Sequence, residues 1–342
     1  MWVGVDTHQR THHAAVIDER GGVIADREFT ADTAGYIALT GWAGGHGTVV
    51  RYGIESTGSY GAGLARALTT TGTTVVEVNS PNLQIRATQG KSDPIDAVMA
   101  ARAAQSGRAT VIPKDTTTVI ESIRVLSVTR DSAVKARTAI MSQIRDLILT
   151  APASLREAVD SATTRGRIAR CRSLRPDLTR LADPVQATKH ALRSLARRID
   201  ALDTEIAHLE HALTQLVTAT APTLHALPQV GTITAAQLLI TAGANIDRIH
   251  NEAAFARLCG VAPIPASSGK THRMRLSRSG DRQANKALHM ITIGRLHTDP
   301  RSIAYLTRRT TEGLGKPDII RCLKRYLVRE IHHALITDLT TT

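Results

Sequence analysis

Four acidic residues in the first hundred positions could together bind a divalent metal ion. Asp6 and Glu55 each end a short apolar run. Asp93 and Asp96 stand three residues apart in K-S-D-P-I-D-A, which places both carboxylates on one side of the start of a helix. Carboxylate clusters hold Mg²⁺ or Mn²⁺, and two such ions about 4 Å apart stabilise the attacking and leaving oxygens of a phosphodiester. The four acids therefore predict a metal site for phosphoryl transfer, although each alone could equally be a helix cap or a surface charge.

A second group of residues, near the C-terminus, could act on a phosphate directly. Ser267 and Ser268 precede Gly269 in a run of small residues. The cations that follow them, opposed by Asp281, are Lys270, Arg273, Arg275, Arg278, Arg282 and Lys286. Such a field can bind nucleic-acid phosphate and stabilise a pentavalent transition state, while a serine alkoxide attacks to form a phosphoserine link. Most serines in loops are structural, so the pattern alone leaves both interpretations open.

The elements that would position the acids form an α/β arrangement with a mixed sheet. Apolar runs and alternation predict strands over residues 2–5, 14–17, 23–29, 49–54 and 74–78. Helices are predicted over residues 32–42, 60–68 and 93–104. Asp32 is the predicted N-cap of the first helix. The first and fourth strands are neighbours in this arrangement, so Asp6 and Glu55 should lie close together.

The middle of the chain is predicted to be helical and elongated. An unbroken heptad seam, stepping by three and four residues, consists of Leu192, Leu195, Ile199, Leu202, Ile206, Leu209, Leu213 and Leu216. This seam predicts a coiled coil with a second chain, hence a dimer or tetramer, unless the helix over residues 118–149 covers it. Arg130 and Arg137 interrupt the apolar stripe of that earlier helix. Six arginines in residues 163–180 indicate either a solvated linker or a phosphate-binding arm.

Residues 227–236 predict two helices joined by a tight turn at Gly231. The pattern resembles a helix-hairpin-helix, whose turn amides bind backbone phosphate. The glycine usual two residues before Gly231 is Gln229 here, so a hairpin that only packs is the alternative.

Composition indicates a partner that is a polyanion. The chain has 342 residues, 43 basic and 30 acidic, for a net charge of +13. The predicted domains, residues 1–110, 111–221 and 222–342, carry net charges of −1, +5 and +9. Clustered Lys and Arg bind phosphates by displacing counterions, whereas an aromatic content of 3% argues against modules that stack bases. The fold class expected is α/β plus α, with mainly helical second and third domains.

The cysteines and histidines predict little chemistry. Cys171, Cys259 and Cys322 are far apart, which argues against disulfides and a cysteine zinc site and favours a reducing cytoplasm. The sequence contains no H-E-x-x-H, no signal-peptide pattern and no apolar run of about 18 residues, so we expect a soluble, cytoplasmic protein that does not contact membranes. His8 lies two residues from Asp6 and could reach the metal site.

Four short motifs carry a family resemblance. V-G-V-D, I-E-S-T-G-x-Y, V-N-S-P and K-S-D-P-I-D-A closely resemble the DEDD transposases of bacterial insertion sequences, a family that includes the Piv-type DNA invertases. Later motifs, L-P-x-V-G-x-x-T-A, F-A-R-L-C-G-V-A-P, S-S-G-K and R-L-S-R-S-G-D-R-Q-A-N-K-A-L, are similar to the second transposase domain of that family. The resemblance covers nearly the whole chain.

The resemblance implies a RuvC-like domain with a ribonuclease-H fold, in which Asp6, Glu55, Asp93 and Asp96 bind Mg²⁺ or Mn²⁺. It implies that Ser268, or its neighbour Ser267, is the DNA nucleophile. It further implies guidance by a bridge RNA that pairs with donor and target DNA. The function expected is therefore that of an insertion-sequence transposase and DNA recombinase. The alternatives are a RuvC-like nuclease that uses water, a sugar or acetate kinase of the actin-like fold, and a non-enzymatic coiled-coil DNA-binding protein.

Overall fold

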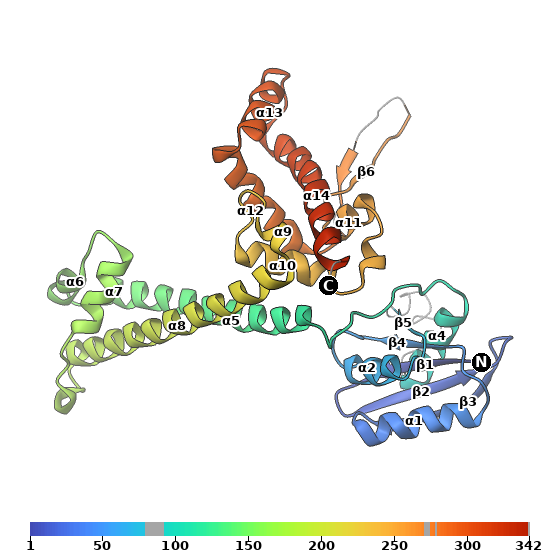
Figure 1. Ribbon diagram of the computed structural model, residues 1–342. Helices are drawn as coiled ribbons and strands as arrows, with labels where there is room; N and C mark the ends of the chain where they lie inside the picture. The colour runs from blue at the N-terminus through green and yellow to red at the C-terminus, as the bar shows by residue number, and fades with distance from the viewer. Residues whose placement is uncertain (79–91, 270–273, 278, 341–342) are drawn as a thin grey trace. The chain divides into compact units, whose positions relative to one another are not determined.

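The computed structural model describes residues 1–78, 92–269, 274–277 and 279–340, and only the backbone of Asp247, Arg248 and Leu276 (Figure 1). The chain forms two compact units. The first contains Met1–Thr118 and Ala242–Phe255, and the second contains Val119–Thr241 and Ala256–Thr342. The finer division at residues 110 and 221 stays a prediction.

The first unit contains a five-stranded mixed sheet. Its strands are β1 (Trp2–Thr7), β2 (Thr11–Ile17), β3 (Val23–Thr30), β4 (Arg51–Glu55) and β5 (Val75–Val78), in the order β3-β2-β1-β4-β5. The pairs β1–β2 and β2–β3 are antiparallel, whereas β1–β4 and β4–β5 are parallel. The predicted mixed sheet is confirmed, with strand boundaries that differ from the expected ones by a few residues.

Helices cover both faces of this sheet. On one face, α1 (Thr33–Gly45) and α2 (Ala62–Thr70) contribute Leu39 and Leu64 to a core that also contains Val5 and Ile54. On the other face lies α4 (Asp93–Gln105), whose buried residues are mostly alanines. The Asp32 carboxylate accepts a hydrogen bond of 2.8 Å from the Gly35 amide, which confirms it as the N-cap of α1. The predicted α/β architecture therefore has two helical layers.

The second unit begins with a long antiparallel helical hairpin. Its elements are α5 (Val119–Thr150), α6 (Ala153–Val159), α7 (Thr164–Ser173), the 3₁₀ turn η1 (Leu178–Arg180) and α8 (Pro184–Thr220). The helices α5 and α8 lie side by side in Figure 1. Beyond them, the first part of the segment with six arginines is not an open linker, because α7 buries Ile168 and Cys171.

The heptad seam of α8 is covered in part by this same chain. Leu192 and Ile199 are fully buried in a core shared with Ile140 and Ile144 of α5. Further along, Leu209 is only half-buried. The intramolecular alternative left open by the sequence is thus confirmed for part of the seam.

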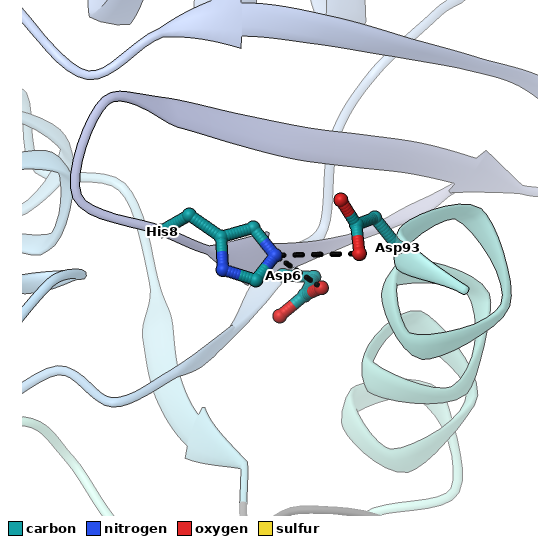
Figure 2. Close-up of side chains that lie close together, drawn as sticks. All are labelled: Asp6, His8 and Asp93. Carbon is teal, nitrogen blue, oxygen red and sulfur yellow. Dashed lines mark ion pairs between the residues drawn. The ribbon is translucent and has the colours of Figure 1, made fainter. Parts of the chain in front are cut away.

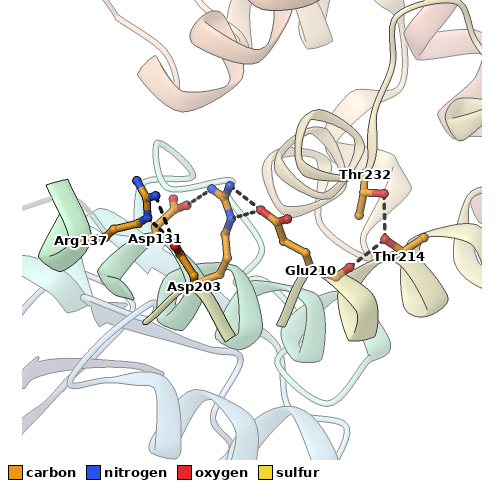
Figure 3. Close-up of polar contacts among 7 residues, drawn as sticks. Asp131, Arg137, Asp203, Glu210, Thr214 and Thr232 are labelled. Atoms are coloured by element: carbon orange, nitrogen blue, oxygen red, sulfur yellow. Dashed lines mark hydrogen bonds and ion pairs between the residues drawn. The ribbon is translucent and has the colours of Figure 1, made fainter. Parts of the chain in front are cut away.

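The two arginines that interrupt the apolar stripe of α5 join it to α8. The Arg130 guanidinium lies 2.6 Å from the Glu210 carboxylate. Two helical turns further along, Arg137 forms an ion pair with Asp203 (Figure 3). Both pairs are partly exposed, so each contributes about 1 kcal/mol or less to stability, and their main effect is to set the register of the hairpin.

The remainder of the chain is mainly helical, as expected. Its elements are α9 (Pro222–His225), α10 (Thr232–Ala242), η2 (Ile246–Ile249), α11 (Glu252–Leu258), β6 (Pro263–Pro265), β7 (Met274–Leu276), α12 (Arg282–Thr298), α13 (Pro300–Thr311) and α14 (Lys316–Thr340). Near the end of α14, the buried Asp338 carboxylate accepts hydrogen bonds from the amides of Thr223 and Leu224, so it caps α9. Across the described residues, every helix is too short or too polar to span a lipid bilayer.

The turn between α9 and α10 differs in detail from the sequence prediction. The backbone takes a left-handed conformation at Gln229, with φ of 65°, and not at Gly231. The Gln229 side chain lies over α12, where its amide donates a hydrogen bond of 3.1 Å to Thr298. A Cβ atom on Gly294 would lie 2.6 Å from the Gln229 side-chain oxygen, so glycine makes room for this contact. The helix after Gly231 is confirmed, whereas the preceding helix α9 ends at His225, before the predicted segment, and the left-handed residue of the turn is Gln229, which packs on α12.

Candidate functional site

Two glycines allow α4 to lie directly against the sheet. A Cβ atom on Gly4 would lie 2.0 Å from the Ala97 carbonyl oxygen, and one on Gly53 would lie 2.6 Å from the Ala100 carbonyl oxygen. Side chains alternate between the two faces of a strand, so Asp6 shares the face of Gly4, and Glu55 shares the face of Gly53. The N-terminus of α4 is therefore brought to the same edge of the sheet as both acids.

The structure brings two of the four predicted acids, Asp6 and Asp93, close together at this edge. Asp96 is near enough to raise the pKa of Asp6, and Glu55 lies on the neighbouring strand, but neither belongs to the group whose ligand atoms lie within 4.8 Å of one another. Asp6, Glu55 and Asp96 are exposed by only 7%, 7% and 3%, whereas Asp93 is half-buried. The register of β1 and β4 places Val5 beside Ile54, so Asp6 and Glu55 are next to each other in adjacent parallel strands. The Thr7 hydroxyl fixes the end of β4 with a hydrogen bond of 3.1 Å to the Glu55 carbonyl. Burial of charged groups at one point is costly unless a cation compensates them.

His8 completes the cluster. Its Nε2 atom lies 3.3 Å from a carboxylate oxygen of Asp6 and 3.3 Å from one of Asp93, and Figure 2 shows this ring nitrogen facing both carboxylates. One ligand atom from each of these three residues lies within 4.8 Å of the others. The sequence left the participation of His8 open, and the structure brings it to the site.

The electrostatics of the site favour a bound cation. Burial raises the pKa of the Asp6 carboxyl above its usual value. His8 opposes that rise, whereas the negative charges of Asp93 and Asp96 add to it. Oxygen-rich sets of carboxylates match the preferences of Mg²⁺ and Mn²⁺, and a divalent cation would reverse the repulsion that Asp6 experiences. The residues present therefore fit such an ion.

The backbone after Glu55 is also unusual. Ser56 has φ of 53°, a left-handed conformation that non-glycine residues seldom adopt. Strained residues of this kind occur preferentially at functional sites, where the surrounding structure holds them. No pattern in the sequence identifies Ser56, because the strain arises from the turn that follows β4.

Ser268 lies in an exposed loop between β6 and β7. Both Ser267 and Ser268 are exposed. The two strands pair in antiparallel register, with Pro263 opposite Leu276. The hairpin that these strands form is described at residues 261–269 and 274–277, and it is called the serine hairpin below.

Close backbone contacts fix the base of the serine hairpin. Gly260 and Gly280 have φ of 65° and 106°, and a Cβ atom on Gly280 would lie 2.6 Å from the Gly260 nitrogen. The Asn285 amide donates hydrogen bonds of 3.1 and 3.0 Å to the carbonyls of Cys259 and Gly260. Lys324 in turn donates a hydrogen bond of 2.7 Å to the Asn285 side-chain oxygen. The loop that carries Ser268 thus extends from a rigid base.

The predicted nucleic-acid-binding cations are only partly described. Lys270, Arg273 and Arg278 lie outside the described residues. Among the others, Arg275 is exposed on β7, and Arg282 and Lys286 are on α12. Asp281, which appeared from the sequence to oppose these charges, is the N-cap of α12 and accepts hydrogen bonds from the amides of Gln283 and Ala284.

Comparison with known proteins identifies the family in both parts of the chain. Residues 3–151, which contain the four acids, match the family of DEDD transposases of IS110, described as "Transposase". Residues 221–307, which contain Ser268, match the family described as "Transposase IS116/IS110/IS902 family". Together these matches cover more than two thirds of the chain.

Two curated proteins are similar over different lengths. The "Mini-circle putative transposase for IS117" of Streptomyces coelicolor is 24% identical, over 98% of this chain and 94% of its own length. The "Insertion element IS900 uncharacterized 42 kDa protein" of Mycobacterium paratuberculosis is also 24% identical, over 43% of this chain and 39% of its own length. With both family matches and the DEDD acids at the edge of the sheet, the chain belongs to the IS110 family of transposases.

Proposed function

We propose that this transposase cleaves and rejoins DNA as a site-specific recombinase of an insertion sequence, with Mg²⁺ or Mn²⁺ held by Asp6, Glu55, Asp93 and Asp96. The observation that carries the proposal is the cluster of Asp6 from β1, Asp93 from α4 and His8, with the buried Asp96 nearby and Glu55 on the adjacent strand β4. The mixed sheet with helices on both faces supports the RuvC-like fold that the resemblance implies.

Each residue of the site has a separate task in this proposal. Asp6, Glu55, Asp93 and Asp96 would supply oxygen ligands to the ion, and Asp93, which is more exposed than the other three, would face the DNA. A bound divalent ion supplies charge stabilisation for the oxygens of the phosphodiester and activation of a hydroxyl. His8, when protonated, is held by the Asp6 and Asp93 carboxylates and would orient both of them.

We propose Ser268 as the nucleophile. Its exposure on the serine hairpin gives DNA access to the hydroxyl. Attack by the serine oxygen on phosphorus forms one ester bond as the strand's own P–O bond breaks, so the bond energy is kept for rejoining without ATP. The acids belong to the first unit, and Ser268 belongs to the second.

Replacement of Ser268 by Ala tests this assignment. We expect Ser268→Ala to form no covalent protein–DNA adduct and no recombinant product, and the wild type to form both. Ser267→Ala is the matched control, since it removes an exposed hydroxyl from the adjacent position, and its effect should be milder. Denaturing gels of end-labelled DNA show the adduct as a slowly migrating band. Recombination by Ser268→Ala at the wild-type rate, or products with free ends only, would mean that water is the nucleophile, as in a RuvC-like nuclease.

We also propose that a bridge RNA guides the enzyme to DNA. The charge of +13 supports binding to nucleic acid, and the aromatic content of 3% fits a protein that leaves base recognition to pairing by RNA. Sequencing of the RNA that copurifies with the protein tests this point, and a preparation that binds DNA and recombines it without RNA would refute it.

Assembly into a dimer or tetramer is proposed from the uncovered part of the seam. Ile206 and Leu209 remain half-buried although α5 lies alongside α8. If a second chain covers them, Ile206→Asp should reduce the mass measured by light scattering to that of one chain. Leu192→Asp is unsuitable for this test because Leu192 is fully buried within the chain. A mass of one chain for both the wild type and Ile206→Asp excludes the assembly.

A further inference from the structure

A groove lies between the serine hairpin and α14. Its volume is about 890 Å³. Arginines dominate its polar lining: Arg275 comes from β7, and Arg321, Arg325 and Arg329 come from α14, against the carboxylate of Asp318. None of these α14 residues belongs to the cationic segment that the sequence singled out.

We propose that this groove binds one unpaired strand of the DNA substrate beside the cleavage site. In the complex, the α14 arginines contact its phosphates and Tyr326 stacks on a base. This inference rests on the proposed function, because it takes the serine hairpin to be the part of the protein at which DNA is cut. Ala266, two residues before Ser268, lines the groove, so a strand bound there continues toward the serine loop.

The spacing of the charges suits a polynucleotide. Arg321, Arg325 and Arg329 are four residues apart, so they follow one face of α14 with a rise of about 6 Å between neighbours. Arg321 forms an ion pair with Asp318, which holds its guanidinium at the groove. A row of cations with this regularity gains affinity from each phosphate that it neutralises.

Tyr326 supplies the second observation. It is 52% exposed, in a chain with only two Trp, two Phe and five Tyr. It lines both the groove and a neighbouring hollow of about 270 Å³ that contains Arg301 and Arg308. Its ring is held edge-on by Tyr305, with ring centroids 5.6 Å apart. An exposed aromatic ring between two hollows lined by arginine is the arrangement by which proteins stack bases of a single strand.

An unpaired strand fits these features better than a duplex. In a duplex the bases are stacked on one another inside the helix, so Tyr326 reaches a base face only where the strands have separated. DNA is favoured over RNA because the groove adjoins the serine loop, and DNA is the substrate of a transposase.

Binding of labelled oligothymidine to the full chain, measured by fluorescence anisotropy in EDTA, tests the proposal. We expect the double variant Arg321→Gln/Arg329→Gln to bind at least tenfold more weakly. The slope of log K against log salt should fall by about 1.4, from about 0.7 for each lost phosphate contact. The matched control is Lys135→Gln/Arg145→Gln, which removes two exposed charges from α5, one of them also beside an acid, Asp146. The control should bind like the wild type.

A second pair of variants tests the stacking contact. Tyr326→Leu should weaken binding about tenfold, whereas Tyr326→Phe, which keeps the ring, should not. Unchanged affinity in the arginine and tyrosine variants, or an equal loss in the α5 control, overturns the proposal. So does a larger effect of these variants on the binding of blunt duplex, or of RNA of the same sequence, than on the binding of the DNA strand.

The assay separates this proposal from the proposed function. Binding in EDTA needs neither the metal nor the serine hydroxyl, so Ser268→Ala should bind the strand normally. Loss of adducts with intact strand binding would concern the nucleophile alone. Normal adduct formation with no effect of the α14 variants on binding would refute the groove alone.

Discussion

Replacement of Asp6 by Asn should abolish metal-dependent DNA cleavage and also stabilise the metal-free protein at neutral pH. Burial raises the pKa of the Asp6 carboxyl, and Asp93 and Asp96 add to the effect against the opposing charge of His8. The pKa of Asp6 is higher in the folded state than in the unfolded state. The contribution of this carboxyl to the stability of the fold is therefore fully present below the unfolded-state pKa, and it is lost as pH rises through the folded-state pKa. At pH 7, far above the unfolded-state pKa, ionisation of this carboxyl therefore favours the unfolded state, and Asn removes that penalty.

Thermal unfolding in EDTA measures this effect. Between pH 4 and pH 8, the wild type should lose stability relative to Asp6→Asn, since only the wild type ionises at this position. With a divalent ion present, the wild type should become more stable than Asp6→Asn. At a Mg²⁺ concentration a hundred times its Kd, binding should stabilise the wild type by about 2.7 kcal/mol and leave the stability of the variant unchanged. Asp146→Asn is the control, because Asp146 is an exposed residue of α5 in the second unit, where it pairs with Arg145, and cleavage should persist. Wild-type cleavage by Asp6→Asn, or equal stabilisation of both proteins by Mg²⁺, would exclude the metal site.

Replacement of Gly4 by Ala should unfold the first unit or displace α4. The added Cβ would lie 2.0 Å from the Ala97 carbonyl oxygen and 2.1 Å from the Ala101 nitrogen, both of which are backbone atoms that cannot rotate away. Overpacking typically costs about 1–3 kcal/mol, and contacts this short with backbone place Gly4→Ala at or above the upper end. Because α4 carries Asp93 and Asp96, DNA cleavage should be lost together with stability.

The control for this prediction is Gly41→Ala. Gly41 lies in α1 and has no atom within 4 Å of the position of an added Cβ. Ala is favoured over Gly within a helix, so this variant should gain up to about 1 kcal/mol. Urea unfolding compares the two variants with the wild type. If Gly4→Ala were as stable as Gly41→Ala, α4 would not pack on β1 in the way described.

The elements could be predicted from the sequence because their signals are local. Apolar alternation located the strands of the first unit, and Asp32 marked a helix start that the structure confirms. The nearness of Asp6 and Glu55 could also be predicted, since they lie at the ends of neighbouring parallel strands. The positions of Asp93 and Asp96 are harder to predict from the sequence, because they depend on the close packing of α4 against Gly4 and Gly53. The need for glycine at these two positions appears only in the structure.

Other features depend on contacts between distant parts of the chain. Arg130 looked like a defect in an apolar stripe, and its role requires Glu210, 80 residues away. The left-handed Gln229 depends on α12, and the groove beside α14 depends on where the serine hairpin lies. Sequence spacing carries no record of such pairings. For this reason the sequence singles out the cations that follow Ser268 and not those of α14.

The register of the helical hairpin implies that its length is adjustable in fixed steps. Arg130 pairs with Glu210 and Arg137 with Asp203, so the two ion pairs are one heptad apart on both helices. Removing residues 131–137 and 203–209 together would join the remaining segments in the same pairing. Each such deletion would shorten the hairpin by about 10 Å, measured from the start of α5 to the end that carries α6 and α7. It would also rotate that end by about 20° about the axis of the hairpin. The helical hairpin thus has the properties of a molecular spacer. A series of variants with shortened hairpins would show which arrangements of the DNA substrate still recombine at each hairpin length.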